Sequence, residues 1–304
     1  MPRYGVIDVG TNSVKLHVGE RRPDGTWRTV VDRGEVTRLG ERLAETGALA
    51  PDAMERTVTA ISGMADEARR DEATAVVAVG TMGMRTASNS EAFIAEVERR
   101  SGVRIEIISG EEEGRLAYLA VKSGLGLSAG SLVIFDTGGG SSQFTFGRGS
   151  IVEERFSVNV GAVRYTERYG LAGAVSPEQL RAVLDAIAAD LARLDTARSP
   201  DALVGLGGAV TNIAAVKHGL VRYDPNIVQG TVLERGEIER QIELYRTRTA
   251  DERRGIVGLQ PQRAEVILAG ACIVRTVVSK LGKDALTVSD RGLRHGLLID
   301  RFGG

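Results

Sequence analysis

The chain has 304 residues, of which 42% are hydrophobic and 26% charged, the composition of an ordinary soluble globular protein. A net charge of −1 provides no overall field that would attract nucleic acid or an anionic membrane, so neither is an expected partner. Cys272 is the single cysteine, which excludes an internal disulfide, and no apolar run is long enough to span a bilayer. We therefore expect a cytoplasmic protein.

In the first part of the chain, strand patterns alternate with helical ones. We expect strands at residues 4–8, 14–20, 26–39, 74–81 and 103–109, and helices at 51–70, 90–102 and 110–124. A small, glycine-rich segment follows at residues 123–131. It indicates a boundary between two domains, at residues 1–125 and 126–304, with a terminal helix that could pack back on the first domain.

The second part repeats the alternation. We expect strands at residues 131–136, 143–147, 150–158, 201–208 and 285–289, and helices at 176–194, 209–219 and 263–282 before a short terminal helix. The helix at 176–194 has the clearest start, because Ser176 is a good N-cap, Pro177 suits the first helical position and Gln179 stands at the third.

Two loops that begin with aspartate and glycine match at a constant separation along the chain. Asp8 corresponds to Asp136, Gly10 to Gly138, Ser13 to Ser141 and Gly19 to Gly147. A buried strand precedes each loop and another strand follows it. The match indicates an internal duplication, which would place one such loop in each α/β domain.

Glycines let a backbone approach a ligand closely and present consecutive N–H groups, and serine adds a hydroxyl donor. An aspartate in the same loop would repel a phosphate unless a cation lies between them, and Mg²⁺ is the usual cation. The loops therefore indicate a metal-phosphate clamp with Asp136 and Asp8 as metal ligands. The alternative is a pair of tight turns, with Asp and Gly present for turn geometry. A third glycine loop, with Gly207 and Gly208, opens onto a helix and could hold further phosphate.

The acidic residues 111–113 follow Ser109 and Gly110 at the start of a helix. Ser109 and Glu112 fit a capping box, and acidic residues suit a first helical turn. Glu113 is one residue beyond the box, so it is the carboxylate left for another task. Near a phosphate clamp, it could deprotonate an attacking water.

Together these residues resemble the exopolyphosphatase/guanosine pentaphosphate phosphohydrolase family, which belongs to the superfamily of actin, Hsp70 and sugar kinases. Six motifs carry the resemblance, at residues 7–16, 80–89, 107–116, 135–144, 205–214 and 289–298. It implies an α/β fold of two RNase H-like domains facing each other across a cleft, in a homodimer. It also implies a phosphoric anhydride hydrolase, an exopolyphosphatase that releases terminal phosphate from inorganic polyphosphate with Mg²⁺ as cofactor and a Glu-activated water.

The resemblance also assigns roles to residues. Glu113 falls where the family has its catalytic base, and Asp136 falls on its metal and phosphate loop. The phosphate-contacting positions fall on Asn12, Ser13, Gly139, Gly140 and Ser141. Lys15 and Arg85 fall where the family keeps basic residues near the cleft.

Two departures from the family pattern concern charge. Gln143 stands where the family normally has glutamate, at the mouth of the phosphate loop, where its amide could position a water. His295 also replaces a usual glutamate, and we expect a structural role for it, as for His17 and His218.

The sequence leaves other functions open. Guanosine pentaphosphate is the nearest alternative substrate to polyphosphate. The same loops could hold ATP in a kinase or ATPase of the superfamily. A protein that senses polyphosphate or a nucleotide with weak turnover is the remaining alternative, because Gln143 removes a carboxylate.

Overall fold

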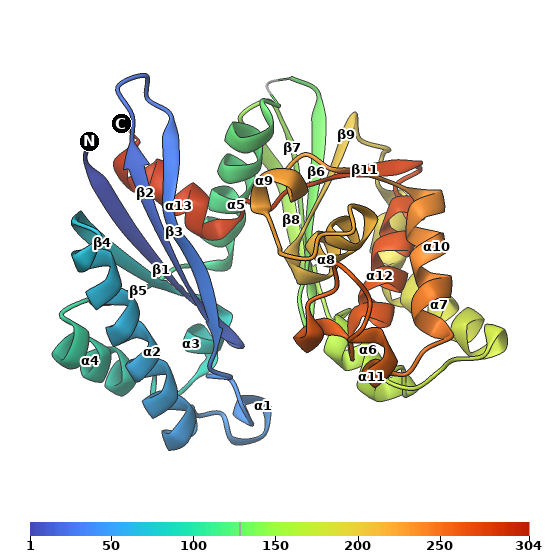
Figure 1. Ribbon diagram of the computed structural model, residues 1–304, viewed down its shortest axis with the longest axis horizontal. Helices are drawn as coiled ribbons and strands as arrows, with labels where there is room; N and C mark the ends of the chain where they lie inside the picture. The colour runs from blue at the N-terminus through green and yellow to red at the C-terminus, as the bar shows by residue number, and fades with distance from the viewer. Residues whose placement is uncertain (128, 304) are drawn as a thin grey trace. The chain divides into compact units, whose positions relative to one another are not determined.

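The computed structural model describes residues 1–127 and 129–303, and contacts within it divide the chain into two compact units (Figure 1). Unit 1 comprises Met1–Ala120 and the C-terminal segment that begins at Leu293, and unit 2 comprises Val121–Gly292. The chain leaves unit 1 inside helix α5 (Gly110–Leu125), whereas the sequence placed the boundary at the end of that helix. Ser128, within the expected boundary segment, and Gly304 lie outside the described residues.

Unit 1 contains one five-stranded sheet in the order β3-β2-β1-β4-β5. Its strands are β1 (Arg3–Val9), β2 (Ser13–Arg21), β3 (Trp27–Val36), β4 (Ala73–Gly80) and β5 (Ile105–Ile107). Its helices, besides the first part of α5, are α1 (Leu43–Thr46), α2 (Pro51–Arg70), α3 (Met82–Thr86), α4 (Ser90–Ser101) and α13 (Leu293–Phe302).

Unit 2 contains a six-stranded sheet in the order β10-β11-β9-β6-β7-β8. Its strands are β6 (Ser131–Thr137), β7 (Ser142–Arg148), β8 (Ile151–Val158), β9 (Ala202–Leu206), β10 (Val232–Glu234) and β11 (Ala285–Val288). Its helices are α6 (Ala162–Tyr169), α7 (Pro177–Asp190), α8 (Gly207–Lys217), α9 (Pro225–Val228), α10 (Arg235–Arg246), α11 (Ala250–Arg253) and α12 (Ile267–Lys280), with 3₁₀ turns η1 (Ala192–Thr196) and η2 (Pro261–Arg263).

The two sheets share one topology, and the α/β fold expected from the sequence is confirmed. In each unit three antiparallel strands form a meander, and the first of them also pairs in parallel with a later strand. Thus β1, β2, β3 and β4 correspond in order to β6, β7, β8 and β9. The expected duplication is therefore present in the strand pairing, with β10 as an additional edge strand of unit 2.

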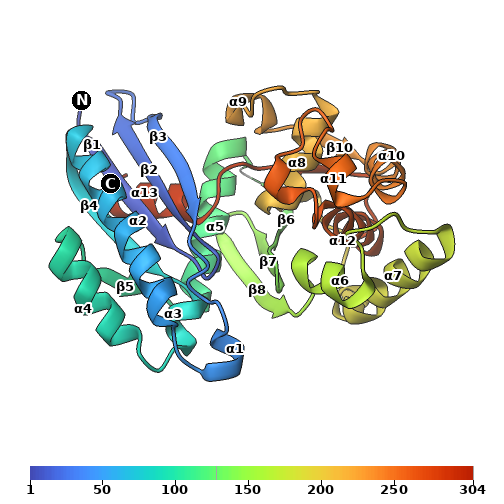
Figure 2. The same ribbon diagram turned by 60° about the horizontal axis from the view of Figure 1, so that its bottom comes forward.

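Helices cover both faces of the unit 1 sheet. Successive side chains of a strand point to opposite faces. Accordingly, Val6 packs with Leu116 and Leu297, whereas Ile7 belongs to a core with Ile61. Helix α2 therefore covers one face and α13 the other, as the views in Figures 1 and 2 agree.

The core of unit 2 surrounds α12, which packs against α6, α7, α8 and α10 (Figure 2). Nearly every residue of α12 is buried, including Cys272. Burial raises the pKa of the Cys272 thiol to about 12, so it stays protonated and serves as a small apolar side chain.

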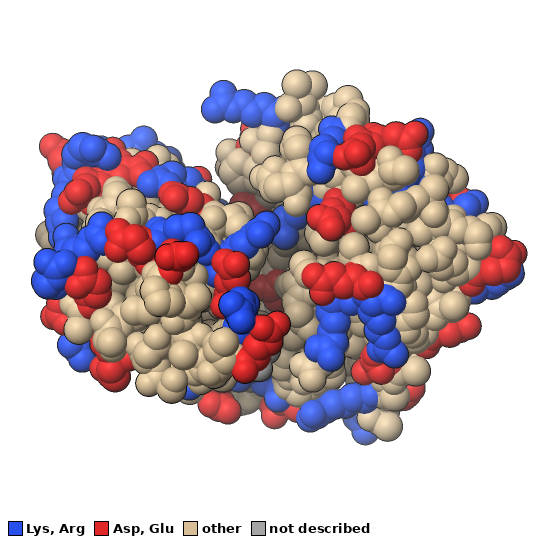
Figure 3. Space-filling model, turned by 90° about the horizontal axis from the view of Figure 1, so that it is seen from below, with Lys and Arg blue, Asp and Glu red and all other residues tan. Residues whose placement is uncertain are grey.

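Charged side chains of both signs are interspersed on the face seen in Figure 3, in keeping with the net charge of −1. None of the helices in the described ranges is both long enough and apolar enough to cross a bilayer.

Candidate active site

The first aspartate-glycine loop joins β1 to β2, and we name residues 8–15 hairpin 1. Asp8 and Lys15 are directly paired across the two strands, so their side chains lie on the same face. The Gly10 N–H donates to the Ser13 carbonyl at 3.0 Å and closes the turn. Asp8 is only 7% exposed, whereas Asn12 at the tip is exposed. Hairpin 1 therefore presents an amide, a hydroxyl and a lysine beside a nearly buried carboxylate.

A neighbouring loop fixes the tip of hairpin 1 and contributes an arginine that the motifs did not indicate. The Asn12 carbonyl accepts from the N–H groups of Thr37 and Arg38, at 3.2 and 3.0 Å. Arg38 is exposed and has a φ of 51°, a left-handed conformation that is unfavourable for arginine. Strain of this kind is often retained at functional sites, so Arg38 becomes a candidate phosphate ligand. No sequence pattern indicates such a backbone angle.

Glu113, the expected base, lies beside Arg85. The Arg85 Nη2 is 3.2 Å from the Glu113 Oε2, and Arg85 Nη1 also donates to the Ile108 carbonyl at 2.7 Å. Both side chains are partly exposed, at 27% for Arg85 and 21% for Glu113. Because Arg85 is anchored to the backbone, it can hold the carboxylate in one orientation while leaving part of it accessible.

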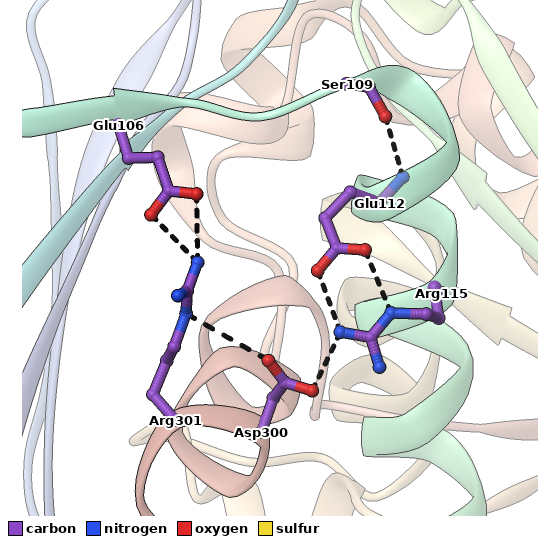
Figure 4. Close-up of polar contacts among 6 residues, drawn as sticks. All are labelled: Glu106, Ser109, Glu112, Arg115, Asp300 and Arg301. Carbon is purple, nitrogen blue, oxygen red and sulfur yellow. Dashed lines mark hydrogen bonds and ion pairs between the residues drawn. The ribbon is translucent and has the colours of Figure 1, made fainter.

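The start of α5 agrees with the sequence in one respect and differs in another. The Glu112 N–H donates to the Ser109 hydroxyl at 3.1 Å, so Ser109 is the expected cap. The Glu112 carboxylate, however, bonds Arg115 through both oxygens (Figure 4). These bonds from Arg115 lower the pKa of Glu112. Arg115 also bonds Asp300 of α13, so Glu112 helps to join two helices of unit 1 instead of completing a capping box.

The second loop joins β6 to β7, and we name residues 136–143 hairpin 2. Its turn closes as in hairpin 1, with the Gly138 N–H donating to the Ser141 carbonyl at 2.9 Å. Its two serines differ: Ser142 is fully buried and donates to the Val160 carbonyl at 2.6 Å, whereas Ser141 is partly exposed. Ser141 is therefore the serine available to a ligand.

Hairpin 2 offers free backbone donors. The first turn of α6 donates to its carbonyls, from Ala162 to Gly138 and from Val163 to Gly139, both at 2.9 Å. Those bonds satisfy N–H groups that a helix start leaves unpaired and hold the loop in place. Within the described ranges, the N–H groups of Gly139 and Gly140 have no protein acceptor. Two consecutive donors in an exposed loop suit a phosphate.

The third glycine loop, with Gly207 and Gly208, lies against the side chains of Asp136 and Arg263. Gly207 has a φ of +88°, and a Cβ there would lie 2.3 Å from Oδ1 of Asp136. A Cβ on Gly208 would lie 2.7 Å from the Arg263 guanidinium. The two glycines therefore let Asp136 and Arg263 approach the start of α8.

Arg263 is a candidate site residue that the sequence did not indicate. It lines a small pocket together with Thr137, Gly138 and Gly139. Burial lowers the pKa of Arg263, and the charge of Asp136 acts in the opposite direction. A guanidinium beside the phosphate-loop glycines is a suitable anion ligand. Because it stands far along the chain, in the 3₁₀ turn η2, no motif spacing could have found it.

Gln143 is directly paired with Asp136 across β6 and β7. Paired residues of antiparallel strands share a face, so the Gln143 amide lies on the same side of the sheet as the Asp136 carboxylate, which is exposed. Gln143 in hairpin 2 occupies the place that Lys15 has in hairpin 1.

Comparison with known proteins identifies the family of the chain. A family described as the Ppx/GppA phosphatase family matches residues 18–303, nearly the whole chain. The chain belongs to the Ppx/GppA phosphatase family. Membership identifies it as a phosphohydrolase, and the family resemblance inferred from the sequence is confirmed.

Individual relatives extend this result. The Ppx/GppA phosphatase of Aquifex aeolicus is similar over 99% of this chain and 100% of its own, with 33% identity and a TM-score of 0.86. Exopolyphosphatase 2 of Mycobacterium tuberculosis is 28% identical over 100% of this chain and 99% of its own. The likeness to the Aquifex structure confirms two RNase H-like units of the actin-like ATPase fold for this Ppx/GppA chain.

A further relative is longer than this chain. The bifunctional 3-dehydroquinate synthase/phosphatase of Fusobacterium nucleatum is 27% identical over 97% of this chain, which spans 46% of that protein's length.

Proposed function

We propose that this phosphohydrolase is an exopolyphosphatase that releases terminal phosphate from inorganic polyphosphate with the help of Mg²⁺. The observation that carries the proposal is the set of groups around hairpin 2, where free N–H donors lie in the same loop as Asp136 and Arg263 lines the adjoining pocket. The end-to-end similarity to a protein named exopolyphosphatase supports the choice of substrate.

Binding of the terminal phosphate is assigned to hairpin 2. The N–H groups of Gly139 and Gly140 and the Ser141 hydroxyl donate to phosphate oxygens, and Arg263 neutralises part of their charge. Gly207 and Gly208 position Asp136 and Arg263. In unit 1 the phosphate-binding groups are Asn12, Ser13 and Lys15, with Arg38 as an addition from the structure.

The residues present suit Mg²⁺. Asp136 is an exposed carboxylate with the amide oxygen of Gln143 on the same face, and Mg²⁺ prefers a few such hard oxygen ligands, completed by waters and phosphate oxygens. Asp8 supplies a carboxylate from hairpin 1. When bound, the ion offsets phosphate charge and stabilises charge that develops on the leaving oxygen.

Glu113 is assigned the role of general base, and Arg85 orients it. The Glu113 carboxylate takes a proton from a water as the water oxygen attacks the terminal phosphorus. The bond from phosphorus to the bridging oxygen breaks, orthophosphate departs, and the shortened polyphosphate retains the bridging oxygen. We propose that hairpin 1 and Glu113 serve the same reaction as hairpin 2.

The test is phosphate release from short polyphosphate, long polyphosphate, guanosine pentaphosphate and ATP, each with and without Mg²⁺. We expect Mg²⁺-dependent release from polyphosphate with the highest kcat/KM. A higher value for guanosine pentaphosphate would assign that substrate instead. Tight polyphosphate binding without turnover would indicate a sensor, and preferred turnover of ATP would favour an ATPase or kinase.

A further inference from the structure

Two of the three histidines of the chain lie together in unit 1, and one of them, His17, follows Lys15 by two positions on β2. His17 on β2 is directly paired with Asp32 on β3, and His295 lies on α13. His17 is 2% exposed and His295 is 9% exposed. The His17 Nδ1, a carboxylate oxygen of Asp32 and the His295 Nε2 all lie within 4.8 Å of one another.

The spacing within this cluster is longer than good hydrogen bonds require. The Asp32 Oδ2 lies 3.3 Å from the His17 Nδ1 and 3.4 Å from the His295 Nε2, whereas N–H···O bonds are usually about 2.7–3.2 Å. The His17 Nδ1 is buried and has no hydrogen-bond partner within the described ranges. A buried polar atom without a partner costs free energy, so the cluster as it stands leaves a group unsatisfied.

The two distances from the Asp32 Oδ2 suit a metal ion, and the two histidine nitrogens lie within 4.8 Å of each other. Ligand atoms that surround Zn²⁺ tetrahedrally at about 2.0–2.1 Å are about 3.4 Å apart. Two imidazole nitrogens and one carboxylate oxygen are a common zinc donor set, with a water in the fourth position. We propose that His17, Asp32 and His295 bind one divalent transition-metal ion, for which zinc is the best match.

Donor chemistry separates this site from the Mg²⁺ assigned to catalysis. Imidazole nitrogens favour zinc and its neighbours in the first transition row, whereas Mg²⁺ prefers oxygen ligands. Excess Mg²⁺ therefore does not displace the ion.

Arg294 orients the carboxylate of the site. Its Nε donates to Oδ1 of Asp32 at 2.9 Å, and its Nη2 donates to Oδ2 at 3.0 Å. Carboxylates that bind a metal are usually held by such outer hydrogen bonds. The positive charge of Arg294 also repels a cation, so we expect weaker binding than at a site of the same ligands without a neighbouring arginine.

The site has a structural consequence within unit 1. Its ligands come from two adjacent strands of the sheet and from α13, which belongs to the chain's C-terminal segment. A bound ion would fasten that helix to β2 and β3. We therefore expect zinc to stabilise the folded chain.

The test is zinc binding by the purified full-length chain after exhaustive treatment with chelator. The chain is dialysed against Zn²⁺ with excess Mg²⁺, and bound zinc is measured by elemental mass spectrometry. We expect about one zinc per chain in the parent and in the control variant His218→Asn. His218 is a suitable control because its Nε2 faces the Thr231 Oγ1, at 3.0 Å, and not the cluster. His17→Asn and His295→Asn should each lose most of it. Equal zinc in all four proteins would overturn the assignment.

A second measurement needs no variant. Co²⁺ can replace Zn²⁺, and a tetrahedral site with imidazole ligands then shows visible absorption bands. We expect these bands in the parent chain, with loss on addition of one equivalent of Zn²⁺, and a higher unfolding temperature with either ion. Absence of the bands, together with an unchanged unfolding temperature, would refute the site even if the histidine variants failed to fold.

Discussion

Hairpins 1 and 2 have the same backbone but different side-chain chemistry. Each begins with an aspartate at a strand end, and the corresponding glycine N–H closes the turn at 3.0 Å in hairpin 1 and 2.9 Å in hairpin 2. Hairpin 1 carries its own cation, Lys15, beside Asp8, whereas hairpin 2 has the neutral Gln143 beside Asp136. In hairpin 2 the cation comes from a distant segment, as Arg263.

The difference indicates how a duplicated loop can acquire two tasks. The bond that closes the turn is present in both hairpins, and we propose that both bind phosphate. Asp8 is nearly buried, while Asp136 is exposed and approached by Gly207 and Arg263. We infer that hairpin 2 is the main metal and phosphate loop and that hairpin 1 assists it.

The largest effect expected concerns Glu113, the proposed base, which lies in unit 1 outside either hairpin. Glu113→Gln should lower kcat for phosphate release by roughly 10²–10⁴, the usual scale for loss of a general base. Glu112→Gln is the matched control, because its carboxylate faces Arg115 instead and an exposed ion pair contributes only about 0.2–1 kcal/mol to stability. Equal kcat values for the two variants would remove Glu113 from the mechanism.

The next effect separates the two aspartates. Asp136→Asn should lower activity at fixed Mg²⁺ by about 10²–10³, comparable to losing one electrostatic stabiliser of a transition state. Part of that activity should return at high Mg²⁺. Asp8→Asn should have a smaller effect, because Asp8 is only 7% exposed. Both losses of activity are measured by titrating phosphate release with Mg²⁺. A larger loss in Asp8→Asn than in Asp136→Asn would make hairpin 1 the main metal and phosphate loop.

Gly207 tests whether the third glycine loop positions Asp136. Gly207→Ala adds a Cβ that would lie 2.3 Å from the Asp136 carboxylate, so that side chain must move. A misplacement of about 1 Å can lower a rate by about 10²-fold. Gly25→Ala is the control, because Gly25 also has a positive φ of 80° but has no atom within 4 Å of the added Cβ. Both variants should lose stability, and only Gly207→Ala should lose kcat.

The smallest effect concerns the residue that most distinguishes the hairpins. Gln143→Glu places a second carboxylate directly opposite Asp136, and like charges so placed destabilise a sheet. Bound Mg²⁺ should restore the stability that the variant loses. The variant should also be more active than the parent and should need a lower Mg²⁺ concentration for activity. In the proposed mechanism, a second carboxylate near the base should also raise the pKa of Glu113. Glu113 would then lose its proton only at higher pH, so the acidic limb of the pH-rate profile should move to higher pH. Superimposable melting and rate curves for the two proteins would exclude Gln143 from the site.

Sequence patterns predicted the local features of this molecule well. Ser176 caps α7 by accepting from the Gln179 N–H, as expected, and Ser109 caps α5. Both caps depend on residues only three positions apart. Helix α10 lies outside the helices expected from the sequence, although its buried residues Ile238, Ile242 and Tyr245 recur at helical spacing.

Features that depend on distant segments could not be predicted. Arg115, which bonds Glu112 one helical turn away, also bonds Asp300 in the distant helix α13. Arg263 reaches the pocket beside hairpin 2 from a 3₁₀ turn, and the φ of Arg38 follows from bonds to hairpin 1. Each arises from tertiary packing, which local spacing does not encode.

The joint role of the two hairpins in one reaction is tested most directly by a double-mutant cycle. Phosphate release from polyphosphate is measured over a range of Mg²⁺ for the parent, Asp8→Asn, Asp136→Asn and the double variant. Groups that act on one bound ion and one substrate are non-additive, typically by about 0.5–3 kcal/mol. We predict that the fold-loss of phosphate release in the double variant is much smaller than the product of the fold-losses in the two single variants. A shared role would be contradicted if the fold-loss in the double variant equalled the product of the two single fold-losses. It would also be contradicted if both single variants kept the Mg²⁺ dependence of the parent.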